Sequence, residues 1–596
     1  MKQLYQTIRN GAALGLLSLA LLGCSDFLQI TPRDIVTEDN FWNEKADIDQ
    51  MVAGCYASMQ SDNFIRRCIV WGELRSENIY PGSKVQDQED LYQALRENLL
   101  TTNEYCKWNA FYDVINKCNT VIRYAPEVSQ KDPSYRSSDV QATIAEMTAL
   151  RSLCYFYLIR AFDEVPFTRD AVTQEDQVQY LPASSFDYVL GEIIKDLESV
   201  KGNALEHHAS IGQQLDGVGR NYNSNCNRIT RPAINAMLAE MYLWQRNFDR
   251  AIECAEAVIQ AKRDDYERDF SRQTTLSLSA PQLLTAPHGL IVPMYQCTQA
   301  NPAVVADAIF GTGNSFESIF ELSFNRTSSQ TSYVSSSALS ALYGNNLPEK
   351  EGGNNGAGFL AVNSAIVSDV FNGTYDYFAN NYDTRYYTSF QPVDENYGEG
   401  NIRKGVAHSF NLQQQVKNNI QFNSSSQNAF SIQTDLNRNW IFYRLTDVML
   451  LEAEALLMKA TDDESEENTA LLEKAFDLIY LVNARSVTDR TRYMSPTSAE
   501  ATTRGLLIQR LRKERNAELM FEGKRFFDLV RYARFDGKTD VVRNTVTSKL
   551  SSGGSDLFPS MPYLFWPYAK EECQVNPYLV QKSIYGEGRS TYDINE

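Results

Sequence analysis

The segment from residue 510 to 534, with the sequence RLRKERNAELMFEGKRFFDLVRYAR, constrains the fold more than any other part of the chain. Apolar residues in and just before it, separated by four, eight and seven positions, fall on one face of a helix. These residues are Leu507, Leu511, Leu519 and Phe526. The pattern predicts one long helix, or a helix with a tight break at Gly523, that packs by this face into an α-helical body.

Glu514, Glu518 and Glu522 recur every four residues on the same segment. Like charges at this spacing repel each other unless basic side chains lie beside them. We expect the partners on the same segment, at Arg510, Arg515, Arg525 and Arg531. The sequence thus predicts a half-buried ion network that fixes packing more than it adds net stability. A glycosidase pair of Glu518 and Glu522 is disfavoured, because such carboxylates must flank a bound sugar from opposite sides.

The overall composition is that of a large globular protein. The 596 residues are 43% hydrophobic and 22% charged, which is ample for a large core. The net charge of -19 argues against nucleic acid as a partner, because the phosphates would be repelled. The 33 tyrosines and 29 phenylalanines mostly belong in a core. Tyrosine-rich loops also form sugar- or peptide-binding surfaces.

The first 23 residues have the pattern of a signal peptide. Lys2 and Arg9 supply positive charge, residues 12–22 form an apolar run, and Gly23 precedes Cys24. A cysteine directly after such a run is typical of bacterial lipoproteins, so we expect Cys24 to become the lipidated first residue. An ordinary signal peptide with an incidental cysteine is the alternative. No other apolar run approaches the roughly 20 residues that a spanning helix needs.

Neither a metal site nor a catalytic site is predicted. The nine cysteines after Cys24 contain no C-x-x-C motif, and one or two disulfides remain possible. Cys118, Cys154 and Cys254 lie in helical patterns and are most simply core residues. The four histidines lack metal-ligand spacing. Motifs for a serine nucleophile, a P-loop, a dinucleotide site and a zinc protease are missing from the sequence, so we expect no enzyme and no cofactor.

Helical patterns come in pairs. Residues 228–259 predict two antiparallel helices joined at 245–247, similar to a tetratricopeptide hairpin, and residues 443–457 with 470–485 repeat the arrangement. Further helices are expected from a cap at Thr37 through Tyr56, at 108–124 and at 141–162. A single hairpin cannot bury its apolar face, so the pairs must stack. We expect a helical repeat scaffold over about 100–260 and 440–535.

Long segments rich in Gly, Asn, Ser and Tyr interrupt the helices. They cover residues 202–227, 271–343, 344–439 and 536–563. Within them only residues 316–324, FESIFELSF, alternate as a strand does. Loops of this length in a compact domain are usually functional or disordered. We therefore expect a loop-rich ligand-binding part over about 262–439.

Several of these blocks together resemble the SusD/RagB family of outer-membrane nutrient-binding lipoproteins. The clearest is ER-x-x-EL-x-FEG-x-R-x-x-DL-x-R within residues 510–534, and residues 26–42 fit the family's mature N-terminus. The end of the chain has Trp566-Pro567-Tyr568 where the family usually has Pro-Ile-Pro. The resemblance covers Cys24 to Tyr585. It implies a mostly α fold, with tetratricopeptide-like helix pairs and long irregular insertions, in a single domain over 24–596 after the signal peptide 1–23.

The resemblance also implies a function. Family members are non-catalytic surface lipoproteins that capture oligosaccharides for a SusC-like TonB-dependent outer-membrane transporter. Sugars stack on aromatic rings and take hydrogen bonds from Asn, Asp and Arg. Two irregular segments, 71–80 and 375–387, offer these side chains. The expected ligand-binding residues are Trp71, Asn78, Tyr80, Tyr377, Tyr382, Arg385 and Tyr386. The structural alternative places Trp71 in the core and pairs Arg385 with Asp383.

Three other functions stay open at this point. Capture of peptides, as in the RagB branch, would use hydrogen bonds to the ligand backbone. A surface glycoside hydrolase would need two opposed carboxylates in a closed cleft. A purely structural helical scaffold would have no use for the long loops rich in Tyr and Asn.

Overall fold

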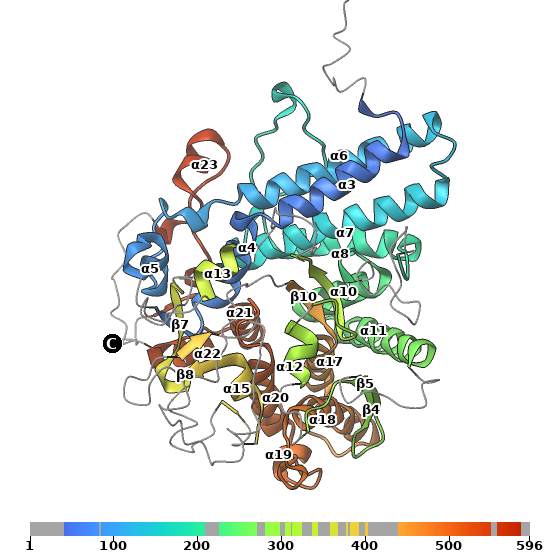
Figure 1. Ribbon diagram of the computed structural model, residues 1–596. Coiled ribbons are helices and arrows are strands. Elements are labelled where there is room, and N and C mark those ends of the chain that lie inside the picture. Colours follow the sequence, from blue (N-terminus) through green and yellow to red (C-terminus); the bar gives the residue numbers. More distant parts are fainter. Residues whose placement is uncertain are drawn as a thin grey trace, which may run out of the picture.

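A computed structural model describes most of the chain between residues 41 and 585, and every structural statement below concerns the described residues. They are 41–82, 85–208, 226–270, 280–298, 304–311, 313–324, 337–343, 358–366, 377–378, 382–392, 400–402, 439–549 and 557–585. The predicted signal peptide and Cys24 lie outside them. The prediction of a mostly α-helical fold is confirmed (Figure 1).

The long helices form a stack that follows the chain from one neighbour to the next. Each helix up to α18 packs on the one before it in the series, and α20 packs on both α17 and α18 (Figure 1). The series is α3 (Lys45–Met59), α6 (Asn109–Lys131), α7 (Ser137–Phe162), α8 (Phe186–Val200), α10 (Arg231–Trp244), α11 (Phe248–Asp269), α17 (Leu445–Lys459), α18 (Glu466–Ser486) and α20 (Arg504–Leu519). Both predicted helix pairs, α10 with α11 and α17 with α18, are therefore present.

Local sequence explains where these helices start. Thr230 caps α10 by accepting a hydrogen bond from the Ala233 N–H, and a proline stands in the first turn of the helix, where its missing N–H costs nothing. The cap predicted at Thr37 lies outside the described residues. The first long helix instead begins at Lys45, where Glu44 and Asp47 form a reciprocal capping box. From Lys45 onward the predicted helix through Tyr56 is present.

Short helices and strands connect and cover the stack. The short helices are α4 (Asp62–Ile69), α5 (Glu89–Leu95), α12 (Val304–Ala306), α13 (Ser337–Tyr343), α15 (Arg385–Ser389), α19 (Ala499–Thr502), α21 (Arg525–Asp536), α22 (Asp540–Val546) and α23 (Lys570–Val575). The strands are β1 (Ile79–Pro81), β2 (Val165–Pro166), β3 (Ala183–Ser184), β4 (Gln282–Thr285), β5 (Ile291–Met294), β6 (Ser318–Leu322), β7 (Leu360–Val362), β8 (Phe390–Pro392), β9 (Gly400–Ile402) and β10 (Trp440–Arg444). The strand predicted at 316–324 is β6.

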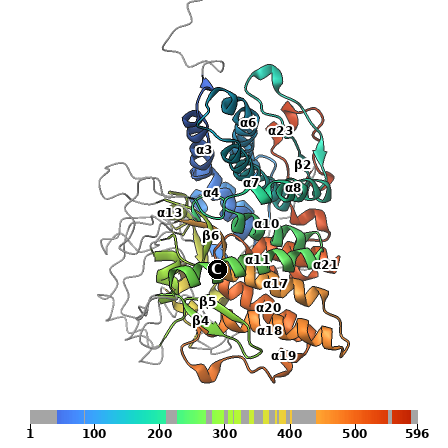
Figure 2. The ribbon, with the colours of Figure 1, turned by 90° about the vertical axis from the view of Figure 1, so that its right-hand side faces the viewer.

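The strands join segments that are far apart in the sequence. The largest sheet has the order β1-β7-β9-β8 and is antiparallel, with Ile79 opposite Val362. Strand β6 pairs with β10, which leads directly into α17. Figure 2 shows β4, β5, β6 and α13 on one side of the helices α10, α11, α17 and α20. This side carries the described parts of the segment expected to bind ligand.

Most of the aromatic and cysteine residues of the described part are buried in the core. Cys118, Cys154 and Cys254 are buried, as predicted, and the cysteines of the described part are free thiols. Within the same part of the chain, none of the helices combines the length and apolar character required to cross a membrane.

Candidate functional site

Of the two alternatives for the segment 510–534, the structure shows the helix with a break at Gly523, and this break lies against the N-terminal part of the chain. Helix α20 ends at Leu519, α21 starts at Arg525, and Gly523 adopts a φ of +70°, which favours glycine. The π-helical turn Val70–Leu74 packs on this break so closely that a Cβ on Gly72 would lie 1.8 Å from the Gly523 carbonyl oxygen. The two glycines allow the two backbones to touch.

Glu73 fixes this contact. Its carboxylate accepts hydrogen bonds from the backbone N–H groups of Phe521 and Gly523, each at 3.1 Å, and of Lys524 at 3.3 Å. The Asn78 amide donates to it at 3.0 Å. Burial raises the pKa of Glu73 to about 7, although these hydrogen bonds act to lower it. A single side chain from residue 73 thus caps the turn between α20 and α21.

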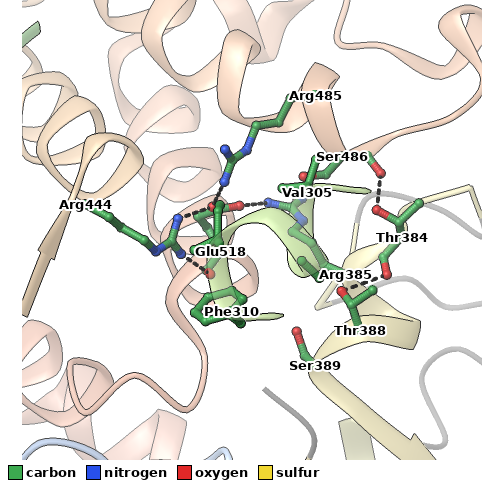
Figure 3. A pocket seen from close by; sticks show the side chains of 12 residues that line it. Val305, Phe310, Thr384, Arg385, Thr388, Ser389, Arg444, Arg485, Ser486 and Glu518 are labelled. Carbon is green, nitrogen blue, oxygen red and sulfur yellow. Dashed lines mark hydrogen bonds and ion pairs between the residues drawn. The ribbon is translucent and has the colours of Figure 1, made fainter. Parts of the chain in front are cut away.

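The predicted ion network exists, but it is fully buried and its partners differ from those expected. Glu518 contacts Arg444 at 2.6 Å, Arg385 at 3.2 Å and also Arg485 (Figure 3). Glu522 pairs with Arg444 at 2.8 Å. The side chains of Glu518, Arg444 and Arg485 are at most 3% exposed. The spacing of the glutamates predicted a half-buried ion network, and the structure shows a more deeply buried one. Most of the cations in this network come from α15, β10 and α18.

Of the four arginines expected to serve the glutamates, only Arg510 does so, at 3.1 Å from Glu514. Arg515 instead binds Asp447 at 2.9 Å and Asp528 at 2.8 Å, and Arg525 binds Glu77 at 2.6 Å. Arg531 binds Glu454 and Asp528. The prediction for these three was wrong, because carboxylates of α17, of the segment before β1 and of α21 itself pair with them instead.

Burial and charge oppose each other in this network. Burial acts to lower the pKa of the Arg444 guanidinium, but the charges of Glu522 and Glu518 act to raise it. Their combined effect is larger, so the pKa of Arg444 lies above its ordinary value. For Asp447, burial would raise the pKa, and Lys524 and Arg515 hold it below the ordinary value. Each ion is therefore charged because its partners surround it.

A cavity of about 20 Å³ lies within the network (Figure 3). Its walls include Arg385, Arg444, Arg485 and Glu518, with Phe310 on one side. This volume can hold about one water molecule and cannot hold a sugar ring. Arg385, a predicted ligand-binding residue, is only 6% exposed here and binds Asp383 at 2.7 Å and Glu514 at 2.5 Å. The structural alternative for this residue matches the geometry.

A second, larger pocket of about 300 Å³ lies where α20, α21 and α22 meet the segment before β1. We call it the Tyr377 pocket. It is lined by Glu77, Tyr377, Arg512, Lys513, Asn516, Arg525, Asn544 and Thr545. The volume lies at the lower end of the range for small-molecule sites, and the lining joins one aromatic ring to several hydrogen-bonding side chains. Such a combination of an aromatic ring and polar side chains is common in small-molecule sites.

The other predicted site residues lie elsewhere. Trp71 is fully buried, 4.8 Å from Phe111 between ring centroids, and its indole N–H donates to the Tyr105 carbonyl at 2.9 Å, which matches the core alternative. Asn78 is also buried and lies behind the Tyr377 pocket, where its amide donates to Asn516 at 2.9 Å.

The remaining predicted tyrosines do not line the Tyr377 pocket. Tyr80 is 8% exposed on β1, opposite Ala361, and Tyr386 is 2% exposed against Phe378. Tyr382 is half-buried, with the Arg492 guanidinium 6.0 Å from its ring centre. Of the seven predicted residues, Tyr377 lines the larger pocket, and Asn78 contacts Asn516, which also lines it.

Comparison with known proteins agrees with this architecture. Residues 316–585 match the model of the SusD family. A SusD-like protein of Formosa agariphila is 24% identical over 87% of this chain and 90% of its own length. The solved structure of surface glycan-binding protein A from Bacteroides uniformis has a TM-score of 0.60 at 18% identity, covering 90% of this chain and 99% of that one.

A laminarin-binding SusD-like protein has a TM-score of 0.57 at 17% identity, with 91% of this chain and all of that chain covered. At these identities the solved structures show the shared fold. The C-terminal part of the chain thus matches the SusD family model, and the chain is similar over most of its length to SusD-like proteins in sequence and in fold.

Proposed function

We propose that the protein is a non-catalytic surface lipoprotein that captures oligosaccharides and passes them to a SusC-like TonB-dependent outer-membrane transporter. The two glycan-binding structural neighbours support the ligand class. The observation that carries the proposal for this chain is the Tyr377 pocket, in which an aromatic ring stands beside Asn516 and Asn544. Such a ring can stack on the C–H face of a sugar while the amides bind its hydroxyl groups.

The hydrolase alternative has less support. Glu518 and Glu522 both bind Arg444 in the interior, so neither is placed to protonate or attack a glycosidic bond. Peptide capture remains the alternative for the Tyr377 pocket, because its amides can bind a peptide backbone as well as a sugar.

Tyr377→Ala is expected to weaken oligosaccharide binding by about tenfold, because the ring face and its contact area are lost. The measurement is calorimetric titration of the purified protein with a panel of oligosaccharides and a peptide digest. Tyr188→Ala is the matched control, because Tyr188 is 55% exposed on α8, away from the pocket. Equal loss in both variants, or none in Tyr377→Ala, would place the site elsewhere. A binding signal with the peptide digest and none with the oligosaccharides would favour the RagB-like alternative.

The proposed anchor gives a second expected result. Cys24→Ser should abolish the incorporation of labelled palmitate and release the protein from the outer-membrane fraction, because the acylated thiol is lost. Cys573→Ser, at the most exposed of the described cysteines, should keep the label. Label retained in Cys24→Ser would refute the anchor. Co-purification of a TonB-dependent transporter with the wild-type protein tests the proposed partner.

A further inference from the structure

A chain of hydrogen bonds runs from the Tyr377 pocket into the interior and ends at Glu73. Two of its members, Glu77 and Asn516, line the pocket, and two others, Asn78 and Glu73, lie behind it. The Asn516 amide nitrogen donates to Glu77 Oε1 at 3.4 Å, and the Asn78 amide nitrogen donates to Glu73 Oε1 at 3.0 Å. Each amide is thus held at one end by a carboxylate.

The two amides also bind each other. The Asn78 nitrogen donates to Asn516 Oδ1 at 2.9 Å, and the Asn516 nitrogen donates to Asn78 Oδ1 at 3.3 Å. An amide nitrogen has two hydrogens, and in both residues one serves the partner amide and the other a carboxylate. The oxygen of Asn516 has a second lone pair, so this atom is left to accept a hydrogen bond from a ligand hydroxyl.

Ionised Glu73 fixes the orientation of both amides. A carboxylate without a proton can only accept hydrogen bonds, so the nitrogen of Asn78, and not its oxygen, must face Glu73. Asn78 then presents one N–H and its oxygen to Asn516, and only one orientation of Asn516 pairs with both. Glu73 is fully buried, so it acts on the pocket only through these amides.

Protonation of Glu73 would break this arrangement. Its carboxylate accepts four hydrogen bonds, from the Asn78 amide and from the backbone N–H groups of Phe521, Gly523 and Lys524. Each oxygen accepts two of them, so a proton must displace one donor. The backbone donors belong to the turn between α20 and α21 and cannot rotate, whereas the Asn78 amide can. Asn78 is therefore the group that turns, and its match to the pocket amide is lost.

This protonation falls near neutral pH. Burial raises the pKa of Glu73 from its ordinary value of 4.5 to about 7. The charged or titratable side chains around it are Glu77, Tyr343, Glu522, Lys524, Arg525 and Lys549. Tyr343 stays protonated because burial raises its pKa, and both Glu77 and Glu522 are paired with arginines. Burial lowers the pKa of Lys549 to about 8, so its titration must be distinguished from that of Glu73.

We propose that Glu73 is a positioning residue for the Tyr377 pocket, which binds a saccharide more tightly when Glu73 is ionised and Asn78 holds Asn516 in place. The oxygen of Asn516 then accepts a hydrogen bond from a sugar hydroxyl. This inference rests on the proposed glycan-binding function and adds a pH dependence to it. Since the protonated carboxyl is the disruptive form, binding weakens as the pH falls.

The test is calorimetric titration of the purified full chain with laminarihexaose, cellohexaose, xylohexaose and mannohexaose, from about pH 5.5 to about pH 8. These saccharides have no group that titrates in this range, so a change in affinity comes from the protein. The affinity for the saccharide that binds is expected to fall about fivefold towards acidic pH, the loss expected for one hydrogen bond. The midpoint is expected at the pKa of Glu73, about 7.

Two variants and a control locate the effect. Glu73→Gln is neutral at every pH, so it should bind about fivefold more weakly than the ionised wild type and lose the pH dependence. Asn78→Ala should also bind weakly at every pH, because it removes the link to Asn516 and leaves the backbone donors of Glu73 in place. Glu452→Gln is the matched control and should keep both the affinity and its pH dependence. Burial also raises the pKa of Glu452 to about 7, but this residue pairs with Lys474 outside the pocket.

The outcomes separate this inference from the function on which it rests. Binding with a flat pH profile, or a transition that persists in Glu73→Gln, overturns the role of Glu73 and leaves glycan capture standing. Absence of binding to every saccharide at every pH overturns both proposals. A transition that Glu73→Gln and Asn78→Ala remove and Glu452→Gln keeps supports both. If melting curves show that a variant does not fold, the wild-type midpoint decides, since about 7 belongs to Glu73 and about 8 to Lys549.

Discussion

Replacing Glu518 with alanine is expected to lower the free energy of unfolding by about 3–5 kcal/mol. The substitution removes the carboxylate that Arg385, Arg444 and Arg485 share, and leaves their charges facing one another in the interior. The cost of breaking such a network exceeds its net contribution to folding, because part of the desolvation of the arginines is no longer compensated. Urea unfolding followed by tryptophan fluorescence measures the change.

Glu253→Ala is the control for this experiment. Glu253 also pairs with an arginine, Arg250, but its side chain is 63% exposed. Surface pairs contribute about 0–1 kcal/mol, so the control should unfold close to the wild type. Similar unfolding curves for both variants would contradict a buried network at Glu518.

Gly72→Ala is expected to destabilise the protein by about 3 kcal/mol or to prevent folding. The added Cβ would lie 1.8 Å from the carbonyl oxygen and 2.5 Å from the carbonyl carbon of Gly523. These are backbone atoms, so no side chain can rotate away, and the turn Val70–Leu74 must separate from the α20–α21 break. Overpacking of this kind costs about 1–3 kcal/mol even where side chains can adjust.

Gly191→Ala provides a control of the opposite sign. A Cβ at Gly191, inside helix α8, would meet nothing within 4 Å. Alanine there should stabilise the helix by about 0.5–1 kcal/mol. Thermal unfolding of both variants checks the pair, and a Gly72→Ala protein that melts with the wild type would contradict the close approach of the two backbones.

The helical scaffold could be predicted because its signals are local. Three- and four-residue periodicity located α6, α7, α10, α11, α17 and α18, and Gly523 marked the break between α20 and α21. The spacing of the glutamates of α20 also predicted an ion network. Their partners could not be predicted, since Arg385 and Arg444 lie 133 and 74 residues away from Glu518. A sequence pattern shows that a charge needs a partner, but it does not show which distant segment supplies one.

The pocket was predictable only in part. Tyr377 was selected because it lies in a tyrosine-rich irregular segment, which is where binding residues are often found. Arg512, Lys513 and Asn516 were missed, because polar residues on an amphipathic helix ordinarily face solvent. Their position beside Tyr377 depends on how α20 packs.

The contact between Glu73 and the α20–α21 turn also determines when folding can finish. Glu73 must meet Phe521, Gly523 and Lys524, which follow it by 448 to 451 residues. Closing so long a loop is entropically costly, and proteins dominated by distant contacts fold slowly. During synthesis the turn Val70–Leu74 cannot make this contact until residues 521–524 have emerged. A chain that stops before residue 521 would leave the Glu73 carboxylate without its backbone donors. This contact can therefore form only in a nearly complete polypeptide.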